Sequence, residues 1–574
     1  MPSPHPGEFA RRVIRKVRTT LGFAPPPKPK PAPEPVLDLR EDPIGPERPL
    51  PDVQYVYIVG GLPRHFAGRT ASILTKTRLF YEKYGTESVI VTAVPSAELD
   101  DLSHAWRERG ALAPGVRLVS LLDYYPDPTV HDGPPIEYPL EEPGLRWIKE
   151  VDQPVYRFFD ERGVYRLWKR YDYAGRMILR DRWNENRIRI SREEFRLDGT
   201  LRRISYVDPV NNYPRESIYY ANDGTPQLNH WSMLNSNGVN LDTFRVVYFD
   251  ADGQPVRNPV DPNAWTPVLH TCLDELIGDR PTFLTNEDRF IDDIVLSYRR
   301  PNVKKVLVIH NAHINPPYAD IHSIRPAYQP CLSREKDSDA VVFLTRTQRA
   351  EAEAHVGRRD TFRVVPHPAR TPHLKPGIER DRKLAIMMSR LDAQKQLDHA
   401  ISAFALVLKS VPDARLEIYG NGPLVEPTLQ AQIERLGVGD RVKLMGYTRD
   451  PAAAYQRAGM SLLTSRFEGA PLTLQESLMH GCPVISYDLR YGPADILTDG
   501  ENGCLVKYGD VKAMAAKIVE VMQDPALHQR LVDASALSAE DFTEPVFLRR
   551  WSTLFHELAD AGWDGPDAPS RETS

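Results

Sequence analysis

Short runs of β-branched and aromatic residues alternate with longer amphipathic stretches from about residue 53 onward. One amphipathic stretch covers residues 70–84, and another covers residues 287–298. Such alternation is typical of parallel strands joined by crossover helices, which cover both faces of the sheet. The predicted strands of this first sheet are YVYIVGG from residue 55, SVIVTA from 88, PTFLT from 281, KKVLVIH from 304 and AVVFLT from 340.

The pattern between residues 147 and 260 interrupts this series. Short alternating runs rich in tyrosine and arginine are separated there by glycine turns. The turns are ERG at 161–163, YAG at 173–175, and Asp-Gly pairs at 198–199, 223–224 and 252–253. Asp-Gly turns between alternating runs are strong hairpin signals, because both residues tolerate positive φ. We therefore expect an inserted antiparallel β-meander, with exposed edges suited to pairing with another copy and arginines suited to an anionic acceptor.

A second α/β series follows the turn VVPHPAR at residues 364–370. Its predicted strands are LAIMMS from residue 384, RLEIYG from 415, RVKLMG from 441, MSLLTS from 460 and PVISYD from 483. The series predicts a second doubly wound parallel sheet. Open α/β sheets bind ligands at the carboxyl ends of their strands, so we expect the chemistry in a cleft between the two sheets.

Composition excludes several classes of protein. The chain has 41% hydrophobic and 26% charged residues, as ordinary soluble proteins do, and no apolar run approaches the ~18 residues of a membrane span. Its formal net charge of -5 argues against a general nucleic-acid coat. The cysteines, at 272, 331, 482 and 504, include no CxxC pair. Neither a zinc site nor a disulfide framework is indicated, and we expect a reducing, cytoplasmic location.

The N-terminal segment has its own composition. Residues 9–21 interleave arginine and lysine with apolar residues at helical spacing, and PPPKPKPAPEP follows at 25–35. The basic amphipathic pattern fits a tether to an anionic membrane surface. A solvated tail is the alternative, and both readings stay open.

Two basic residues stand where the first strand of the second sheet meets its helix. Arg390 ends the strand, and Lys395 lies at the entry to a predicted helix over residues 397–409. A lysine opposes the macrodipole there, so an anion that both lysine and amides bind is the simplest explanation. Arg390 can bind two oxygens and Lys395 adds a mobile charge, which suits a pyrophosphate. The alternative is an exposed lysine and an arginine paired with a local carboxylate.

Two carboxylates, Glu468 and Glu476, lie eight positions apart after a later strand. Gly469 lets the backbone turn closely, and Pro471 precedes a helix that ends near residue 481, so Glu476 lies about one turn inside it. Both carboxylates could accept hydrogen bonds from sugar hydroxyls. The alternative for Glu476 is a capping box that begins at Thr473.

Other groups at the same strand ends strengthen the anion reading. The backbone amides of Leu472 and Thr473 would face the same anion as the basic pair. The loop GNGP, which starts at Gly420, occupies another strand-to-helix junction of this sheet.

The motifs together resemble a known family. SRLDAQK (389–395), YGNGP (419–423), GYTRD (446–450) and the pair Glu468 and Glu476 resemble the retaining GT-B enzymes of glycosyltransferase family 4. YDLRYGPADILTDGENG (487–503), GGLPRHFAGRTAS (60–72), VIHNAH (308–313) and the meander resemble a narrower group. That group comprises the poly(glycerol or ribitol phosphate) α-glycosyltransferases of wall teichoic acid and relatives that glycosylate serine-rich adhesins.

The resemblance implies a GT-B fold: two Rossmann-like domains face a cleft, with the meander inserted in the first. The implied parts are a basic, proline-rich tail (1–50), the first domain (51–146 and 261–366), the meander (147–260), the donor-binding domain (367–560) and a second tail (561–574).

The resemblance also implies roles for individual residues. Arg390 and Lys395 would bind the diphosphate of a UDP-sugar, Glu476 the ribose and Glu468 the transferred sugar. It places Gly446 and Tyr447 in the pocket for the base. The other predicted donor-site residues, taken from their positions at strand ends and at the start of a helix, are Gly61, Gly420, Leu472 and Thr473. Many family members have Gly-Phe-Gly after the first glutamate, whereas this chain has Gly469-Ala470-Pro471. Proline has no amide to offer a sugar.

The first domain should supply the acceptor side of the cleft. Gly60 and Gly61 end its first strand and allow close approach of a ligand. Arg64, His65 and Arg69 follow and would bring positive charge to an acceptor mouth. A turn with solvated charges is the alternative for each of the three.

Two histidines, His310 and His313, stand at the end of KKVLVIH. A histidine at a strand end that faces a cleft is more often functional than a lone core histidine. The resemblance implies that one of them contacts the donor sugar, and we favour His310. A metal reading is disfavoured, because no carboxylate stands near them in the sequence. Asp250-Ala251-Asp252 imitates a metal-binding DxD motif, but it lies in a hairpin turn of the meander.

The expected activity is transfer of a hexose or N-acetylhexosamine from a UDP-sugar to a hydroxyl of a polymer such as teichoic acid polyol phosphate, with retained configuration. The expected partners are the donor and an anionic polymer or protein acceptor. Glu468, Arg390, Lys395 and His310 would form the catalytic set. UDP-sugar would be a co-substrate, with no cofactor and no metal. We expect a homo-oligomer formed through the meander and no nucleic-acid partner. The alternatives are a glycosyltransferase of a serine-rich protein, its non-catalytic partner subunit, or a GT-B sugar-nucleotide epimerase.

Overall fold

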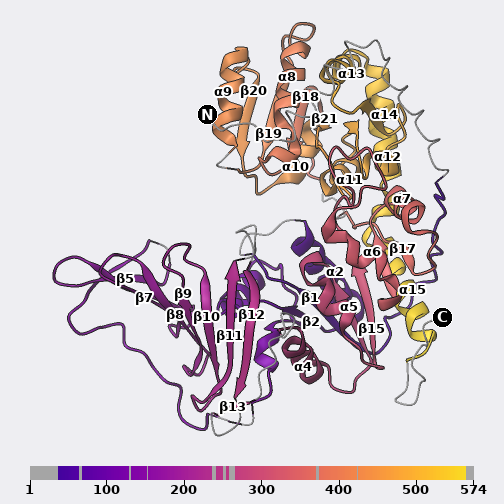
Figure 1. The fold of residues 1–574 in the computed structure, drawn as a ribbon. Coiled ribbons are helices and arrows are strands. Elements are labelled where there is room, and N and C mark those ends of the chain that lie inside the picture. Colours follow the sequence, from indigo (N-terminus) through magenta and orange to yellow (C-terminus); the bar gives the residue numbers. More distant parts are fainter. Residues whose placement is uncertain are drawn as a thin grey trace, which may run out of the picture. The chain divides into compact units, whose positions relative to one another are not determined.

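The strands of the computed structural model form three sheets in the part of the chain that it describes (Figure 1). The described residues are 37–63, 68–127, 129, 131–151, 153–234, 241–249, 254–256, 265–369, 374–422 and 425–563. Two sheets are parallel and the third is antiparallel. The predicted fold class is confirmed.

The first sheet is parallel and has the strand order β17-β16-β15-β14-β1-β2-β3. Side chains of β1 alternate between two hydrophobic cores: Val56 and Ile58 enter one, whereas Tyr55 and Tyr57 enter the other. Both faces of the sheet are therefore buried, which explains its nearly continuous apolar runs. The strands are β1 (Gln54–Val59), β2 (Ser88–Thr92), β3 (Val116–Ser120), β14 (Thr282–Asn286), β15 (Val303–Val308), β16 (Ala340–Phe343) and β17 (Phe362–Val364).

Helices connect the strands of this sheet, as the periodicity predicts. They are α2 (Arg69–Tyr84), α3 (Leu99–Glu108), α4 (Trp265–Ile277), α5 (Asp292–Ser297), α6 (Gln329–Ser333) and α7 (Arg346–Val356). Short 3₁₀ segments are η1 (Leu121–Tyr124), η2 (Arg289–Ile291), η3 (Pro326–Tyr328) and η4 (Glu335–Asp337).

The C-terminal parallel sheet has the order β20-β19-β18-β21-β22-β23. Its strands are β18 (Asp381–Met388), β19 (Arg415–Tyr419), β20 (Val442–Gly446), β21 (Ala458–Leu463), β22 (Val484–Asp488) and β23 (Gly503–Lys507). The helices are α8 (Leu397–Val407), α9 (Glu426–Leu436), α10 (Pro451–Arg457), α11 (Leu472–Met479), α12 (Pro493–Ile496), α13 (Val511–Gln523) and α14 (Pro525–Ser538), with η5 (Ala393–Lys395) and η6 (Glu540–Phe542).

The antiparallel sheet is a meander, because its strands pair in sequence order from β4 to β13. Gly163, Gly175, Gly199 and Gly224 adopt positive φ of 73–88° at its turns, as hairpins require. Residues 250–253, and with them the DxD-like motif, lie outside the described residues. The strands are β4 (Arg146–Lys149), β5 (Val155–Phe159), β6 (Tyr165–Tyr171), β7 (Met177–Trp183), β8 (Arg189–Phe195), β9 (Leu201–Val207), β10 (Pro214–Tyr220), β11 (Pro226–Leu234), β12 (Leu241–Phe249) and β13 (Pro255–Val256).

Several arginines of the meander are paired with carboxylates of neighbouring strands. Arg192 on β8 lies 2.7 Å from Asp181 on β7, and Arg203 on β9 pairs with Glu194 on β8. Opposite charges on adjacent strands stabilise a sheet. The prediction that meander arginines bind an anionic acceptor is therefore corrected for these positions, because their charge is already balanced within the sheet.

The last helix, α15 (Glu544–Asp560), packs into a hydrophobic core of the first sheet. The ring of Phe555 lies 5.2 Å from that of Tyr55 and 4.6 Å from that of Phe283, measured between centroids. Trp551, one turn earlier, is buried in the same core. The predicted extent of the C-terminal domain, 367–560, is wrong for this helix, because its apolar stripe completes the core of the first sheet.

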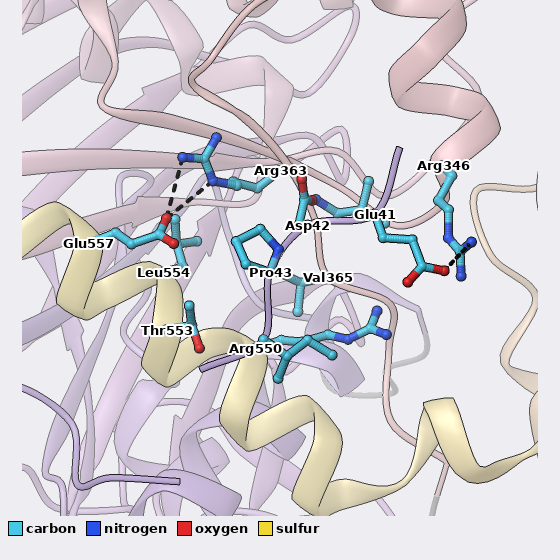
Figure 2. Close-up of a pocket in the computed structure, with 12 residues that line it drawn as sticks. Glu41, Asp42, Pro43, Arg346, Arg363, Val365, Arg550, Thr553, Leu554 and Glu557 are labelled. Carbon is cyan, nitrogen blue, oxygen red and sulfur yellow. Dashed lines mark hydrogen bonds and ion pairs between the residues drawn. The ribbon is translucent and has the colours of Figure 1, made fainter. Parts of the chain in front are cut away.

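Residues 39–50 form a strap across α7, β17 and α15, where a tail was predicted for residues 1–50. The guanidinium of Arg40 lies 2.7 Å from Glu353 of α7, and Asp42 lies 2.8 Å from Arg349 of the same helix. The amide of Gly45 donates to Thr553 of α15. Figure 2 shows the strap beside α15, with Glu41 turned toward Arg346. Ion pairs at α7 and a hydrogen bond at α15 therefore fix the strap. Residues 1–36 and 564–574 of the predicted tails lie outside the described residues.

The described residues include no helix that is long and apolar enough to cross a membrane.

The packing of α15 predicts a large cost for truncating Phe555. Phe555→Ala removes a fully buried ring and should lower the free energy of unfolding by about 3–5 kcal/mol. Denaturant titration followed by circular dichroism measures this loss. Leu537→Ala on α14, where the side chain is 72% exposed, serves as the control and should change stability by less than ~0.5 kcal/mol. Equal effects of the two substitutions would contradict the packing role.

Candidate active site

Both parallel sheets have a switch point where the strand order reverses. In the C-terminal sheet it lies between β18 and β21, and in the first sheet between β14 and β1. Ligands of open α/β sheets bind outside the carboxyl ends of the strands at such points. The loops that follow these four strands carry most of the charged residues singled out from the sequence.

Lys395 and Glu468 form an ion pair at the switch point of the C-terminal sheet. Lys395 is the last residue of η5, which the side chain of Asp392 caps, and its Nζ lies 2.7 Å from Oε1 of Glu468. Both side chains are largely buried, at 16% and 10% exposure. A diphosphate could replace Glu468 as the partner of the Lys395 ammonium, while sugar hydroxyls donate to the Glu468 carboxylate in place of Lys395. The structure thus joins two residues that the sequence places 73 positions apart.

The Glu468 loop approaches the first sheet very closely. A Cβ on Gly469 would lie 2.1 Å from the carbonyl oxygen of His310, so only glycine fits there. The carboxylate of Glu468 is therefore carried by a loop whose backbone touches the end of β15. Two sheets contribute to this one site.

Arg390 points outward, with 62% of its side chain exposed, and its Nη1 lies 2.9 Å from Asp392. The arrangement is the alternative considered above, an arginine paired with a local carboxylate. The exposed pair is weak and leaves the guanidinium able to turn toward an anion. The neighbouring Gly420 has a φ of 141°, and a Cβ there would lie 1.7 Å from the carbonyl oxygen of Ser389. Glycine is thus required where the loops after β18 and β19 pack together.

Glu476 lies just over one turn inside α11, as predicted. The helix begins after Pro471 and has no side-chain cap, so the capping-box alternative that begins at Thr473 is wrong. The hydroxyl of Tyr455 donates to Oε2 of Glu476 over 3.4 Å. Burial, followed by the charge of Glu476, raises the pKa of Tyr455, which keeps that hydroxyl protonated. Leu472 and Thr473 form the first turn, where backbone amides have no partner within the helix.

The remaining predicted donor residues lie at other strand ends. Gly446 ends β20 with a φ of 70°, and its carbonyl accepts from the amide of Gly420 over 2.8 Å. The side chain of Tyr447 is 73% exposed. On the first sheet, Gly61 follows β1, and a Cβ there would meet no atom within 4 Å. Open backbone at these positions leaves room for a ligand, and their roles stay predictions.

His310 has a carboxylate partner that sequence reasoning missed. Its Nε2 lies 2.5 Å from Oε2 of Glu287, which follows β14 on the neighbouring strand. The other oxygen of Glu287 lies 2.5 Å from Nζ of Lys76 on α2. Burial alone would raise the pKa of Glu287, but the charges and hydrogen bonds of Lys76 and His310 lower it to about 2. The fold thus brings a carboxylate to His310 that stands 23 positions away in the sequence.

A second histidine, His367, packs against His310. The rings are stacked with centroids 5.3 Å apart, and Nδ1 of His367 lies 3.2 Å from Oγ of Ser72. Burial lowers the pKa of His367 to about 3, so it is neutral. The sequence showed His367 only as part of a turn. His313 instead stacks on Tyr491 in a fully buried position, which leaves His310 as the histidine beside Gly469.

Arg69 is paired with a buried carboxylate. Its Nη1 lies 2.6 Å from Oδ2 of Asp288, which also accepts from the amide of Gly60 over 3.0 Å. The prediction of free positive charge at Arg69 is thus corrected, because Asp288 balances it. Arg64 and His65 lie outside the described residues. No group of three or more His, Cys, Asp or Glu that could hold a metal occurs among the residues that the structure describes.

Comparisons with known proteins agree with this geometry. Residues 371–537 match the family model "Glycosyl transferases group 1". The chain is 26% identical to the poly(glycerol-phosphate) alpha-glucosyltransferase of Bacillus subtilis over 89% of this chain and 76% of that one. It is 22% identical to the poly(ribitol-phosphate) alpha-N-acetylglucosaminyltransferase of Staphylococcus aureus, over 85% and 97%.

A solved structure gives the same picture of the fold. The crystal structure of TarM superposes with a TM-score of 0.70 at 20% identity and covers 88% of this chain and 99% of that one. At this coverage the match shows that the chain has the GT-B fold. The chain is accordingly a glycosyltransferase of the GT-B fold that carries a glycosyl transferases group 1 domain.

Proposed function

We propose that the protein transfers a hexose or N-acetylhexosamine from a UDP-sugar to a hydroxyl of a polyol phosphate polymer, with retained anomeric configuration. The observation that carries the proposal is the buried pair of Lys395 and Glu468 at a switch point, next to the end of β15. The two relatives support it, since the name of each describes transfer of a sugar to a polyol phosphate polymer. They differ in the sugar, so the proposal covers both.

The proposed donor site uses charges that are already in place. Arg390 and Lys395 would turn from Asp392 and Glu468 to the diphosphate and stabilise it as the bond to the sugar breaks. Glu468 would then accept hydrogen bonds from sugar hydroxyls, and Glu476 from the ribose. Because two cations and the amides of α11 can carry the charge of the leaving group, the proposed reaction needs no metal and no other cofactor.

His310 would face the transferred sugar from the first sheet. Glu287 fixes the ring through Nε2, and His367 packs on its face. A ring held on two sides keeps one orientation, which favours catalysis by positioning. Attack on the same face as the departing diphosphate, through an oxocarbenium-like transition state, would retain the configuration.

The proposed location is the cytoplasm, with the anionic polymer presented at the inner membrane surface. The basic segment of residues 1–23, the proposed tether, lies outside the described residues and stays a prediction.

We also propose a homo-oligomer formed through the meander. Strand β4 is the last strand at one edge of the antiparallel sheet, and all four of its residues are exposed. Ile148 is 57% exposed and Val151, just beyond the strand, is 85% exposed. Between the basic ends of β4, the exposed side chains of Trp147 and Ile148 and the open backbone groups of the edge favour pairing with another copy.

Loss of either partner of the buried pair should abolish most activity. Lys395→Ala, Glu468→Gln and Arg390→Ala should each lower kcat for UDP release by about 10²–10³-fold, because each removes stabilisation of developing charge. The assay uses UDP-glucose and UDP-N-acetylglucosamine, with and without polyol phosphate polymer. Lys383→Ala is the matched control, since Lys383 pairs with Asp413 at the opposite end of β18.

Wild-type rates in Lys395→Ala would contradict the proposed donor site. Absence of UDP release by the wild type with every donor would instead favour the non-catalytic subunit. Conversion of the donor without transfer would favour the epimerase, and transfer only to a serine-rich protein would favour the adhesin enzyme.

The exposed edge predicts an oligomer, and a charged residue introduced at Ile148 of β4 should dissociate it. Ile148→Lys should convert the wild-type oligomer to a monomer in light scattering after size exclusion. Ile190→Lys serves as the control, because Ile190 is 45% exposed on β8, an inner strand of the same sheet. A monomeric wild type, or equal dissociation by both substitutions, would sink the proposed interface.

The buried cluster of Lys76, Glu287 and His310 predicts an acid limit to stability. The pKa of Glu287 is about 2 in the folded protein, below the ordinary glutamate value of ~4.3. Ionised Glu287 therefore contributes fully to the free energy of unfolding above pH ~4.3, and this contribution is lost as the pH falls toward 2. The reference is Lys76→Met with Glu287→Gln, which removes both charges together. The wild type should lose about 3 kcal/mol relative to this variant between pH 5 and pH 2, measured by denaturant titration. A difference independent of pH would contradict the ion pair.

A further inference from the structure

We propose that Glu351 of α7 is a positioning residue for Glu468. It would hold the loop that carries Glu468. A helix of the first sheet, α7, would thereby fix the position of a carboxylate that follows a strand of the C-terminal sheet. The inference rests on the proposed function, because the role of Glu468 toward the donor sugar is part of that proposal.

Glu351 is a buried carboxylate whose two oxygens bind two successive residues of the facing sheet. Oε1 lies 2.7 Å from Nε of Arg490, and Oε2 accepts from the hydroxyl of Tyr491 over 2.6 Å. The residue is 2% exposed. Burial, followed by the charge of Glu351, raises the pKa of Tyr491, so its hydroxyl stays protonated and donates. A buried carboxylate with two such donors is held in one geometry.

The same two residues hold the backbone of Glu468. The amide of Glu468 donates to the carbonyl of Arg490 over 3.0 Å, and the amide of Tyr491 donates to the carbonyl of Glu468 over 3.0 Å. Two reciprocal hydrogen bonds fix both position and direction of a backbone segment. The side chains of Arg490 and Tyr491 thus reach Glu351, while their backbones reach Glu468.

Packing contacts on both sides of Arg490 and Tyr491 also restrict the position of the Glu468 loop. A Cβ on Gly492 would lie 2.4 Å from Cδ of Pro471, so the two loops touch at backbone distance. The ring of Phe467 lies 4.5 Å from that of Tyr318, whose carbonyl accepts from Nη1 of Arg490 over 3.2 Å. The loop is therefore located by contacts at each end, and Glu351 is the carboxylate to which Arg490 and Tyr491 both donate.

The chain offers a matched control on the same helix. Glu353 is also buried, at 7% exposure, and also binds an arginine through both oxygens, with distances of 2.7 Å to Arg40. Its partner belongs to the strap and makes no bridge to Glu468. Glu351→Gln and Glu353→Gln therefore remove the same kind of charge from one helix, and only the first should affect the site.

Glu351→Gln replaces one accepting oxygen by an NH2 group, so Arg490 and Tyr491 no longer each have an oxygen of their own to donate to. We expect kcat for transfer to fall by about 10²-fold, the cost of misplacing a catalytic group by about 1 Å, with the Kd of UDP unchanged. Amide hydrogen exchange of the peptide over residues 466–470 should be faster than in the wild type, because the hydrogen bond of the Glu468 amide opens more often. Glu353→Gln should leave kcat, the Kd of UDP and this exchange at wild-type values.

Tyr491→Phe, which removes one donor and no charge, tests the same contact if Glu351→Gln does not fold, and should show the same effects in weaker form. Wild-type exchange over residues 466–470 in both variants would overturn the inference, as would equal changes in Glu351→Gln and Glu353→Gln. Hydrogen exchange needs no substrate, so it tests the contact even if the wild type shows no transfer. An inactive wild type would then refute the proposed function alone.

Discussion

The close approach of Gly469 to the carbonyl of His310 is the constraint on which the site depends. A single added carbon would lie 2.1 Å from that oxygen, well inside any permitted contact. The two parallel sheets can therefore bring their strand ends together only with glycine at this point. Glu468 precedes the contact and His310 provides it, so the residue expected to bind the sugar and the histidine expected to face it are brought together by one backbone contact.

Charge is balanced throughout the site before any ligand binds. Lys395 faces Glu468, Arg69 faces Asp288, and Glu287 lies between Lys76 and His310. An isolated buried charge is costly, so each cation in a site of this depth needs a partner. A ligand with both a diphosphate and hydroxyls can replace the Lys395 pair on both sides at once. A simple anion would satisfy Lys395 and leave Glu468 buried without its cation.

Much of the fold was predictable because the spacing of apolar residues indicates whether a strand is buried on one face or on both. The strands from residues 55, 384 and 460 were predicted from continuous apolar runs, and the hairpins from Asp-Gly turns. The short strands β3, β17 and β23 were not predicted, because their runs are brief and carry charges. The packing of α15 and of the strap was not predictable either. An apolar stripe or a run of charged residues indicates that a segment packs against something, but it does not indicate which element the segment contacts.

In the site, too, residues at strand ends were predictable from the sequence, whereas contacts between segments far apart in the chain were not. Residues at strand ends of one sheet, such as Arg390, Lys395 and Glu468, were found because parallel strands bring their ends to one edge. Glu287 was missed because it precedes His310 by 23 positions and meets it only through the pairing of β14 with β15.

Pro471 shows how such a distant contact changes a local reading. Its missing amide looked like a lost sugar contact. In the folded chain its ring packs against Gly492, and helix α11 begins at Leu472. The proline therefore packs the Glu468 loop against the segment that carries Arg490 and Tyr491, a contact that the local sequence around Pro471 does not indicate.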